Sequence, residues 1–308
     1  MIDPKYKTQV DLLLQTIPYV AKETIFALKG GTAINLFVRN MPRLSIDIDL
    51  NYLPVDDRET ALKNISDGLA RIKLDLEQSI PRISVTAASR EGQDVKINCQ
   101  LPGAQIKIEV NTTTRGSIQP TRLMRVHDSV ESAFGRFAAI HVVSMAELYG
   151  GKICAALDRQ HPRDFFDVRL LLDNEDFTED IKDGFLVALI SHMRPISEVI
   201  SPMFIDQRQA FETQFSGMAN IPFSYDDFER TRVQLIEQVQ SKLTNSDRQF
   251  LMSFKEGNPD WEILSVKNAQ ELPAVQWKLK NINRLKHDNI KKHRKMVSVL
   301  ENLLFGQK

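Results

Sequence analysis

The most constraining feature of the chain lies between residues 28 and 53, where a glycine turn precedes a short apolar stretch and two alternating aspartates. The turn is Gly30-Gly31-Thr32, and the alternating segment is Ser45-Ile46-Asp47-Ile48-Asp49. Side chains in a strand alternate between two faces, so the aspartates share one face and the isoleucines enter the core on the other. The segment therefore predicts a strand with one buried face and one face that carries two carboxylates.

Two neighbouring carboxylates repel each other unless a cation lies between them. Mg²⁺ accepts one or two protein carboxylates and keeps coordination positions for phosphate oxygens, so Asp47 and Asp49 are candidate metal ligands and catalytic residues. A lone Asp-x-Asp pattern is also typical of a solvated strand face, and a lone Gly-Gly pair is typical of a plain turn. The two patterns at short range together favour a site for metal-dependent nucleotidyl transfer.

The glycine turn is the candidate phosphate-binding part of this site. Gly30 and Gly31 lack a Cβ, so the backbone can turn sharply and approach a ligand closely. Thr32 is predicted to cap a helix over residues 33–38, whose unpaired N–H groups form a site for phosphate. Ser45, which begins the strand motif, is a further candidate for a phosphate contact or simply caps the strand.

These residues resemble the opening motif of the DNA polymerase β-like nucleotidyltransferase superfamily. The wording of residues 29–36 is most similar to the AbiEii/AbiGii-type abortive-infection toxins, and the likeness continues at 147–152, 163–167, 257–261 and 272–279. The resemblance implies the toxin of a type IV toxin–antitoxin system that acts in phage defence, with an NTP as substrate and Mg²⁺ or Mn²⁺ as cofactor. It also implies a tRNA acceptor end as substrate and a separately encoded winged-helix antitoxin, which need not form a stable complex with the toxin.

Residues 82–88, 94–100 and 105–112 are predicted strands, because they alternate or are rich in β-branched residues and are separated by turns at Glu91-Gly92 and Pro102-Gly103. In the last strand, Lys107 and Glu109 point away from the apolar side. Glu109 is therefore a candidate third carboxylate beside the two aspartates. The alternative is that Glu109 pairs with Lys107 on an exposed face.

From Ser144 onward the pattern becomes helical, and two segments carry candidate residues. Lys152 lies beside an apolar stripe, so it either holds a phosphate as a point charge or extends its ammonium to solvent. Asp164 and Asp167 lie on one side of the next helix, where acids also stabilise the helix dipole. The family resemblance implies that Lys152 and Asp164 belong to the active site, with Asp167 as a candidate helper.

The chain of 308 residues has 40 basic and 40 acidic side chains, so a polyanion would have to be held by a local patch. The richest basic segment is 278–295, where apolar residues recur at helical spacing. Its charged face is either solvated or a contact for RNA. The candidate RNA contacts are Lys278, Arg284, Lys291, Lys292, Arg294 and Lys295. Trp261 and Trp277 are expected to be core residues.

The expected fold is α/β (α+β), with a nucleotidyltransferase core of mixed sheet and flanking helices over residues 1–140. Residues 141–308 are expected to form a helical bundle domain that completes the active-site cleft. The predicted reaction transfers NMP from an NTP to an acceptor hydroxyl of tRNA. The alternatives are transfer to a small molecule or a protein, or a non-catalytic nucleic-acid-binding module.

The sequence also bears on location. The N-terminal residues Met1–Lys5 contain no apolar signal core, and no run approaches the ~20 apolar residues of a membrane span. The two cysteines, Cys99 and Cys154, lack metal-ligand spacing and fit a reducing compartment. These features predict a cytoplasmic protein.

Overall fold

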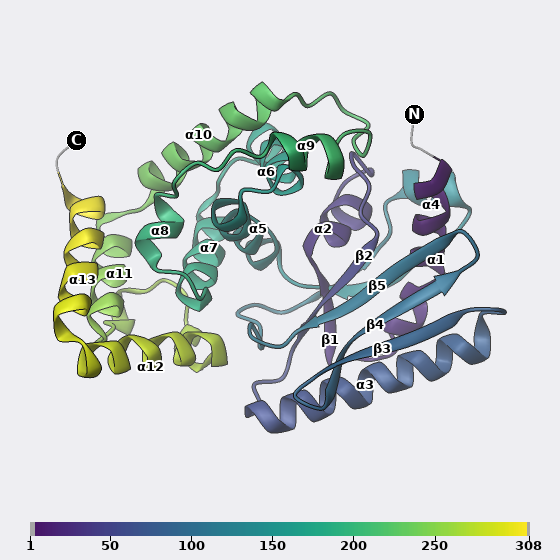
Figure 1. Ribbon diagram of the computed structural model, residues 1–308, viewed down its shortest axis with the longest axis horizontal. Coiled ribbons are helices and arrows are strands. Elements are labelled where there is room, and N and C mark those ends of the chain that lie inside the picture. The colour runs from purple at the N-terminus through teal and green to yellow at the C-terminus, as the bar shows by residue number, and fades with distance from the viewer. Residues whose placement is uncertain (1–3, 307–308) are drawn as a thin grey trace. The chain divides into compact units, whose positions relative to one another are not determined.

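Figure 1 shows a computed structural model of the chain, which describes residues 4–306. The chain forms two compact units. The first comprises Met1–Ser144 and Phe215–Phe223, and the second comprises Met145–Gln214 and Ser224–Lys308. The predicted fold class is confirmed, because the first unit contains a mixed sheet with flanking helices and the second contains helices. No feature of the sequence predicted that residues 215–223 belong to the first unit.

The first unit is built on a sheet of seven strands with the order β3-β4-β5-β2-β1-β7-β6. β2 is parallel to β5, β1 is parallel to β7, and the remaining neighbours are antiparallel. The strands are β1 (Phe26–Lys29), β2 (Asp47–Tyr52), β3 (Ser84–Arg90), β4 (Gln93–Leu101), β5 (Ala104–Asn111), β6 (Arg122–Arg125) and β7 (Ala139–Val142). The predicted strands that became β3, β4 and β5 are confirmed, with ends that move by one or two residues.

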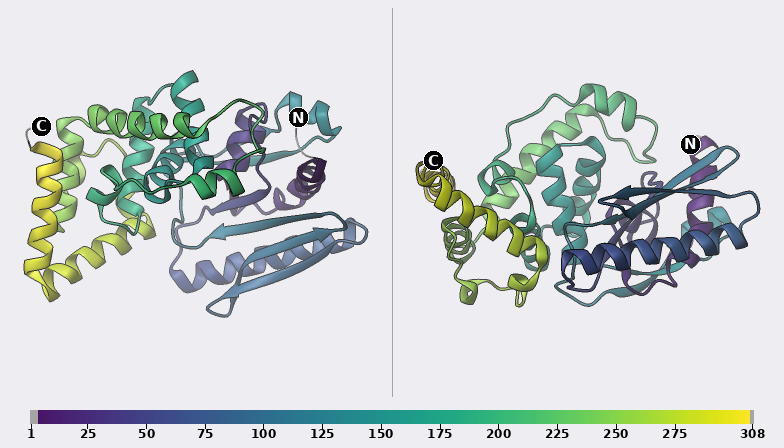
Figure 2. Two further views of the ribbon diagram at one scale, coloured as in Figure 1. Left: turned by 45° about the horizontal axis from the view of Figure 1, so that its top comes forward. Right: turned by 60° about the horizontal axis from the view of Figure 1, so that its bottom comes forward.

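Two long helices, α1 (Pro4–Val20) and α3 (Arg58–Ser79), pack against β5 and β4. Figure 2 shows α3 running along the sheet beside β3 and β4. α3 begins where Asp57 accepts hydrogen bonds from the N–H groups of Glu59 and Thr60. Apolar residues of β2 and β5 are buried in the core, including Ile48 and Ile108, each 0% exposed. The short helix α4 (Asp128–Phe134) ends at Gly135, which adopts the left-handed conformation.

The second unit is helical throughout its regular structure. Its helices are α5 (Met145–Arg159), α6 (Pro162–Asn174), α7 (Glu179–Ser191), α8 (Ile196–Ile200), α9 (Arg208–Gln214), α10 (Tyr225–Lys242), α11 (Asn245–Glu256), α12 (Pro273–Asp288) and α13 (Ile290–Phe305). Two 3₁₀ turns, Trp261–Ile263 and Ala269–Glu271, connect α11 to α12.

The helices α5 and α7 cross at very short range in the core of the second unit. A Cβ on Gly184 of α7 would lie 1.9 Å from the carbonyl oxygen of Ala146, and a Cβ on Gly150 of α5 would lie 2.3 Å from the backbone of Gly184. The crossing therefore requires glycine at both positions. One of the two glycines in the Gly150-Gly151-Lys152 motif thus has a packing role.

The two tryptophans differ in environment. Trp261 is half-buried and packs on Phe250 and Phe254, with ring centroids 5.6 and 6.2 Å apart, so it lies at the edge of the core. Trp277 is 50% exposed on α12, so the prediction of a core role was wrong there. The reason is that Trp277 and buried Lys278 are adjacent on the helix and point in different directions.

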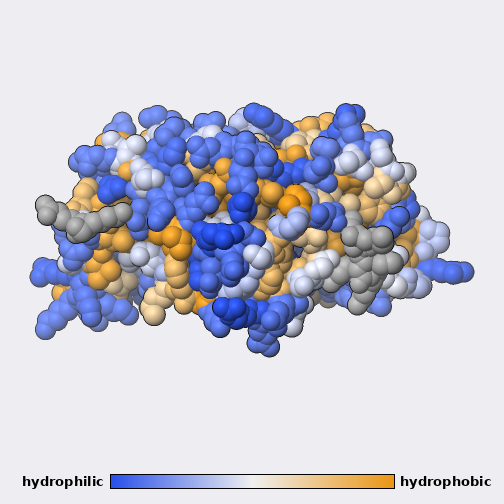
Figure 3. All heavy atoms as spheres, turned by 90° about the horizontal axis from the view of Figure 1, so that it is seen from above, coloured by the Kyte–Doolittle hydropathy of each residue, from blue (hydrophilic) through white to orange (hydrophobic). Residues whose placement is uncertain are grey.

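The face in Figure 3 is mostly hydrophilic, with hydrophobic patches between the polar groups. Over residues 4–306, none of the helices has both the length and the apolar character that crossing a membrane requires. The predicted signal-free segment Met1–Lys5 lies partly outside the described residues.

Candidate active site

The Asp47-Ile48-Asp49 part of the alternating motif begins β2, which lies in the middle of the sheet between β1 and β5. Ser45 and Ile46 precede the strand, and Ile46 is half-buried, so the prediction that both isoleucines enter the core is confirmed only for Ile48. In the parallel pairing of β2 with β5, Asp47 lies opposite Lys107 and Asp49 lies opposite Glu109. These four side chains project from the side opposite to the buried Ile48 and Ile108, and we call them the carboxylate face. The strand alternation thus brings the predicted acids together within the first unit.

Lys107 lies among the acids of the carboxylate face. Its Nζ is 2.9 Å from Glu109 Oε2 and 3.9 Å from Asp47 Oδ2. Burial alone would lower the pKa of Lys107, but the acids Glu109, Asp47 and Asp49 raise it above its ordinary value. The sequence named Lys107 only as the alternative partner of Glu109, and the structure shows that pairing.

The predicted triad of carboxylates stays a prediction. Across the described chain, no three His, Cys, Asp or Glu side chains are grouped so that they could hold a metal ion. Glu109 lies closer to Lys107 than Asp47 does, and Asp47 and Asp49 remain the predicted metal ligands. The catalytic role of Glu109 stays a prediction.

The glycine turn packs directly against β2. Gly30 has a φ of +73°, and a Cβ there would lie 2.6 Å from Asp49 Oδ2. A Cβ on Gly31 would lie 2.8 Å from Arg43 Nη2 and 2.9 Å from Ser45 Oγ. Any larger residue at position 30 would therefore displace the Asp49 carboxylate. The glycines bring the backbone of the turn next to an acidic oxygen, as a site for a metal-bound phosphate requires.

The helix after the turn differs from the prediction. It begins at Gly30 as α2 (Gly30–Thr32) and continues as a π-helix over Ala33–Val38. Thr32 is fully buried inside the helix and makes no capping hydrogen bond, so the predicted cap was wrong. Its hydroxyl instead donates to the carbonyl of Asp47 and lies 3.0 Å from Ser45 Oγ. Thr32 thus fastens the turn to β2, and its hydroxyl is not available to a phosphate.

The oxygen donors of this region fit Mg²⁺ or Mn²⁺. Carboxylate oxygens are the ligands these hard cations prefer, and two of them lie on neighbouring positions of one strand face. The Asp47 side chain is 37% exposed, so it is open to solvent and ions. Asp49 is held beside the backbone of Gly30 by the absence of a Cβ.

The second group of predicted residues forms a buried ionic cluster in the second unit, made of Lys152, Arg159, Asp164 and Asp167. Lys152 Nζ, on α5, lies 2.8 Å from Asp164 Oδ1 and 3.0 Å from Asp167 Oδ2, both on α6. Arg159 Nε and Nη2 donate to Asp164 at 2.6 and 2.9 Å. The sequence indicated three of these residues and missed Arg159.

The environment of Asp164 holds its carboxyl group ionised. Burial would raise its pKa, but Lys152 and Arg159 together hold that pKa well below the usual range. Asp167 is fully buried and also binds Lys152. Asp164 also binds the guanidinium of Arg159, which is 61% exposed. His161, at the start of α6, accepts a hydrogen bond from the N–H of Arg163 at 3.1 Å and acts as the helix cap.

The basic segment is broken by Asn289 into α12 and α13, so its cations do not share one helix face. Lys278 is only 7% exposed, and its Nζ donates to the carbonyl oxygens of Leu189 and Arg194 at 2.8 and 3.0 Å. Burial lowers the pKa of Lys278 to about 8. Lys278 was therefore wrongly included among the RNA contacts. The other candidates are exposed, namely Arg284, Lys291, Lys292, Arg294 and Lys295.

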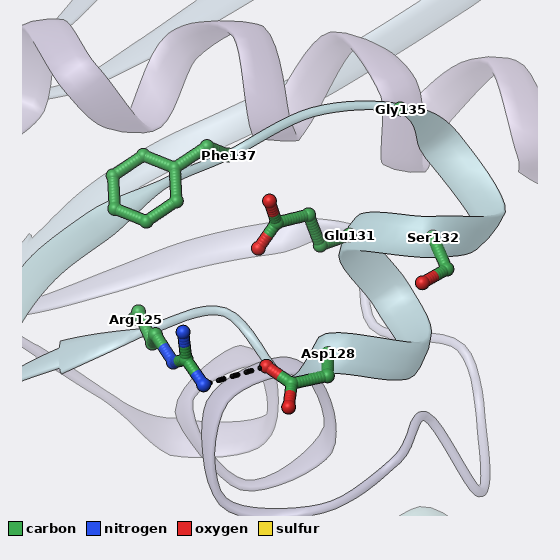
Figure 4. Close-up of a pocket in the computed structure, with 6 residues that line it drawn as sticks. All are labelled: Arg125, Asp128, Glu131, Ser132, Gly135 and Phe137. Carbon is green, nitrogen blue, oxygen red and sulfur yellow. Dashed lines mark ion pairs between the residues drawn. The ribbon is translucent and has the colours of Figure 1, made fainter.

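A cavity of about 710 Å³ lies beside β6 and α4 in the first unit (Figure 4). An ion pair of 2.9 Å between Arg125 and Asp128 borders it, and Phe137 lies across from Glu131. None of the residues predicted from the sequence lines this cavity. It is therefore not part of the candidate site.

Comparison with known proteins places the chain among nucleotidyltransferase toxins. A model of the family described as nucleotidyl transferase AbiEii toxin, type IV TA system, matches residues 11–281. No curated protein matches the sequence. Among solved structures, MenT4, a nucleotidyltransferase toxin from Mycobacterium tuberculosis, is similar in fold, with a TM-score of 0.62 and 13% identity over 91% of this chain and 95% of that chain. Because the family model spans most of the sequence, the chain belongs to the AbiEii nucleotidyltransferase toxins of type IV toxin–antitoxin systems.

Proposed function

We propose that this toxin transfers a nucleoside monophosphate from an NTP to a hydroxyl group at the 3′ end of tRNA, with Mg²⁺ held by Asp47 and Asp49. Its family makes it a nucleotidyltransferase that uses an NTP and has an antitoxin partner. The observation that carries the proposal is the half-exposed pair of aspartates on β2, packed against the backbone of the Gly30-Gly31 turn.

In the proposed reaction, the acceptor oxygen attacks the α-phosphorus of the NTP. The bond from this phosphorus to the oxygen that bridges to the β-phosphate breaks, and pyrophosphate leaves with the electron pair. When bound, the divalent ion neutralises the triphosphate and stabilises the charge that develops on it. The Glu109 carboxylate takes the proton of the acceptor hydroxyl, and the backbone N–H groups of Gly30 and Gly31 and the Ser45 hydroxyl hold phosphate oxygens.

Two residues of the second unit belong to the proposal. Lys152 and Asp164 are required for transfer, and Asp167 helps to hold Lys152 in place. The distances within the buried ionic cluster support this dependence, because both aspartates bind one ammonium group. Loss of Lys152 removes one buried ion pair from each aspartate, and breaking a buried pair is costly because the charges have little access to water.

The proposal that tRNA is the acceptor rests on a local basic surface. The chain has no net charge, so a nucleic acid needs a local basic surface, and five exposed cations of α12 and α13 provide one. We propose that these cations bind the tRNA backbone. The proposed antitoxin is a separately encoded winged-helix protein that acts without a stable complex.

A transfer assay tests the proposal. Purified protein is incubated with Mg²⁺, total tRNA and each of the four α-labelled NTPs, beside an Asp47→Ala variant. The matched control is Asp67→Ala, because Asp67 is an exposed acid of α3 that pairs only with Lys63 across the described residues. We expect label in tRNA with the native protein and the control and none with Asp47→Ala. Label in protein or small molecules would contradict the tRNA acceptor, and no transfer by folded protein would contradict the reaction.

A further inference from the structure

Lys107 has an unusual position for a lysine on an exposed sheet. It lies directly opposite Asp47 in the pairing of β2 with β5, and it is two residues from Glu109 on the same strand face. Its side chain is 31% exposed, yet its ammonium contacts both acids, at 3.9 and 2.9 Å. Asp49 adds to the negative field around it. Asp47 and Glu109 therefore share the ammonium of Lys107.

The position of Lys107 follows from the sheet rather than from a chance rotamer. Strand pairing fixes the backbones of residues 47 and 107 side by side, and neighbouring residues of paired strands point to the same face. Lysine is a point charge on a flexible stem, so its ammonium can turn from one anionic partner to another without movement of the backbone. The sheet thus holds the backbone of Lys107 in place, while its ammonium can move between partners.

We propose that Lys107 is the resident counter-cation of the carboxylate face. It neutralises Asp47 and Glu109 when no metal is bound, and it competes with a divalent ion for Asp47. When metal and NTP arrive together, the ammonium turns to the triphosphate, which restores charge balance. This inference rests on the proposed role of Asp47 as a metal ligand.

The inference has a thermodynamic consequence. A divalent ion alone must displace or tolerate a nearby positive charge, so it binds weakly. An NTP supplies new negative charge for Lys107, so the ion binds more tightly in its presence. By reciprocity, the metal strengthens NTP binding by the same factor. The carboxylate face therefore selects the metal–NTP complex over the free ion.

Lys96 of β4 provides a matched control. It lies opposite Glu109 in the antiparallel pairing of β4 with β5, so it belongs to the same region of the sheet. Lys107 pairs with Asp47 and Glu109, and no ion pair is found for Lys96 in residues 4–306. Removing either lysine changes the net charge equally, but only Lys107 contacts the acids.

Binding of Mn²⁺ to the full-length protein, measured by the loss of the free-ion signal in electron paramagnetic resonance, tests the inference without any turnover. The titration is run without nucleotide on the native protein and on Lys107→Met, Lys107→Arg, Lys96→Met and Asp47→Asn. It is then repeated with α,β-methylene analogues of the four NTPs. We expect Lys107→Met to bind Mn²⁺ roughly fivefold more tightly or better without nucleotide, because two ion pairs of modest strength are removed.

The other variants define the outcome. Lys96→Met should stay within about twofold of the native protein, since Lys96 lies opposite Glu109 rather than Asp47 and makes no ion pair with either acid in the described residues. Lys107→Arg should retain weak binding, and the gain from nucleotide should shrink in Lys107→Met. Unchanged or weaker Mn²⁺ binding in Lys107→Met would overturn the inference while leaving the proposed function intact. Native-like Mn²⁺ binding by Asp47→Asn would instead overturn the metal site and the inference with it.

Discussion

The carboxylate face of the first unit and the buried ionic cluster of the second are built from the same types of residue in opposite environments. In the face, Lys107, Asp47 and Glu109 are 31% to 45% exposed, whereas Lys152 and its two aspartates are 0% to 7% exposed. Exposed ion pairs contribute little to stability and remain open to a ligand. Breaking a buried pair leaves a charge without solvent or partner. One group is therefore suited to exchange cations, and the other holds the fold in place.

The largest effect is expected from Lys152→Met. The change removes the ion pairs that Lys152 makes with two buried aspartates, Asp164 and Asp167. We expect the free energy of unfolding to fall by about 3–5 kcal/mol, together with loss of transfer activity. Urea unfolding followed by circular dichroism measures the stability, and the transfer assay is run on protein that remains folded.

Lys182 offers a matched control for this prediction. It is 4% exposed on α7, and its Nζ lies 3.1 Å from Asp247 Oδ2. Lys182→Met should lose a comparable amount of stability but keep the activity of the folded fraction. If the two variants lose activity in proportion to stability, the contribution of Lys152 would be structural only.

Unlike Lys152→Met, Asp47→Asn should lose transfer activity with little loss of stability. Removing one exposed carboxylate from an acidic face should change the free energy of unfolding by less than about 1 kcal/mol. Transfer activity should fall by roughly 100-fold or more, because a metal ligand contributes several kcal/mol to the transition state. Thermal unfolding and initial transfer rates measure the two quantities. A loss of stability that matches the loss of activity would mean that the two ionic groups do not differ as described.

Sequence reasoning recovered the elements whose signal is local. The alternation of Asp47 and Asp49 gave the face of β2, because strand geometry fixes which side each residue occupies. The turns at Glu91-Gly92 and Pro102-Gly103 marked the hairpins, because a chain that reverses there needs residues that tolerate positive φ. The AbiEii family was recognised from motifs spread along nearly the whole chain, and the family model agrees.

The errors arose where a side chain is bound by a distant part of the chain. Thr32 has the composition of a cap, but its hydroxyl is taken by the carbonyl of Asp47, fifteen positions away. Lys278 reads as surface charge, but the backbone of residues 189 and 194 binds its ammonium. Arg159 carried no signal that distinguished it from other surface cations, and Lys107 was expected only as a partner of Glu109. Only the register of strands and the approach of α5 to α6 place them beside acids.

The two neighbouring glycines of α5, Gly150 and Gly151, give a smaller contrast. A Cβ on Gly150 meets the backbone of Gly184 at 2.3 Å, whereas a Cβ on Gly151 meets nothing within 4 Å. We expect Gly150→Ala to destabilise the protein by about 1–3 kcal/mol through overpacking. Gly151→Ala should stabilise it by up to about 1 kcal/mol, because alanine favours the helix. Melting temperatures of the two variants test this, and equal effects would show that the crossing of α5 and α7 tolerates a side chain.

The smallest effect concerns the pH dependence contributed by Lys278. Burial lowers the pKa of its ammonium from 10.5 in the unfolded chain to about 8 in the folded protein. The neighbouring Lys255 lowers that pKa further, while the pKa of Cys154 is raised to about 12, so this thiol stays neutral. Between pH 8 and pH 10.5 the unfolded chain therefore holds a proton that the folded protein has released. The contribution of Lys278 to the free energy of unfolding must therefore rise as the pH increases from 8 to 10.5, because the unfolded chain binds the additional proton.

A comparison with Lys278→Met isolates this contribution. The free energy of unfolding of the native protein, minus that of the variant, should increase by about 2 kcal/mol between pH 7.5 and pH 10. Lys295→Met, which removes an exposed lysine of α13, should give a difference that stays flat with pH. Urea titrations at the two pH values provide both numbers. A flat difference for Lys278→Met would mean that the hydrogen bonds to residues 189 and 194 keep the buried ammonium charged, as in the buried ionic cluster, and that burial alone does not separate the two kinds of lysine.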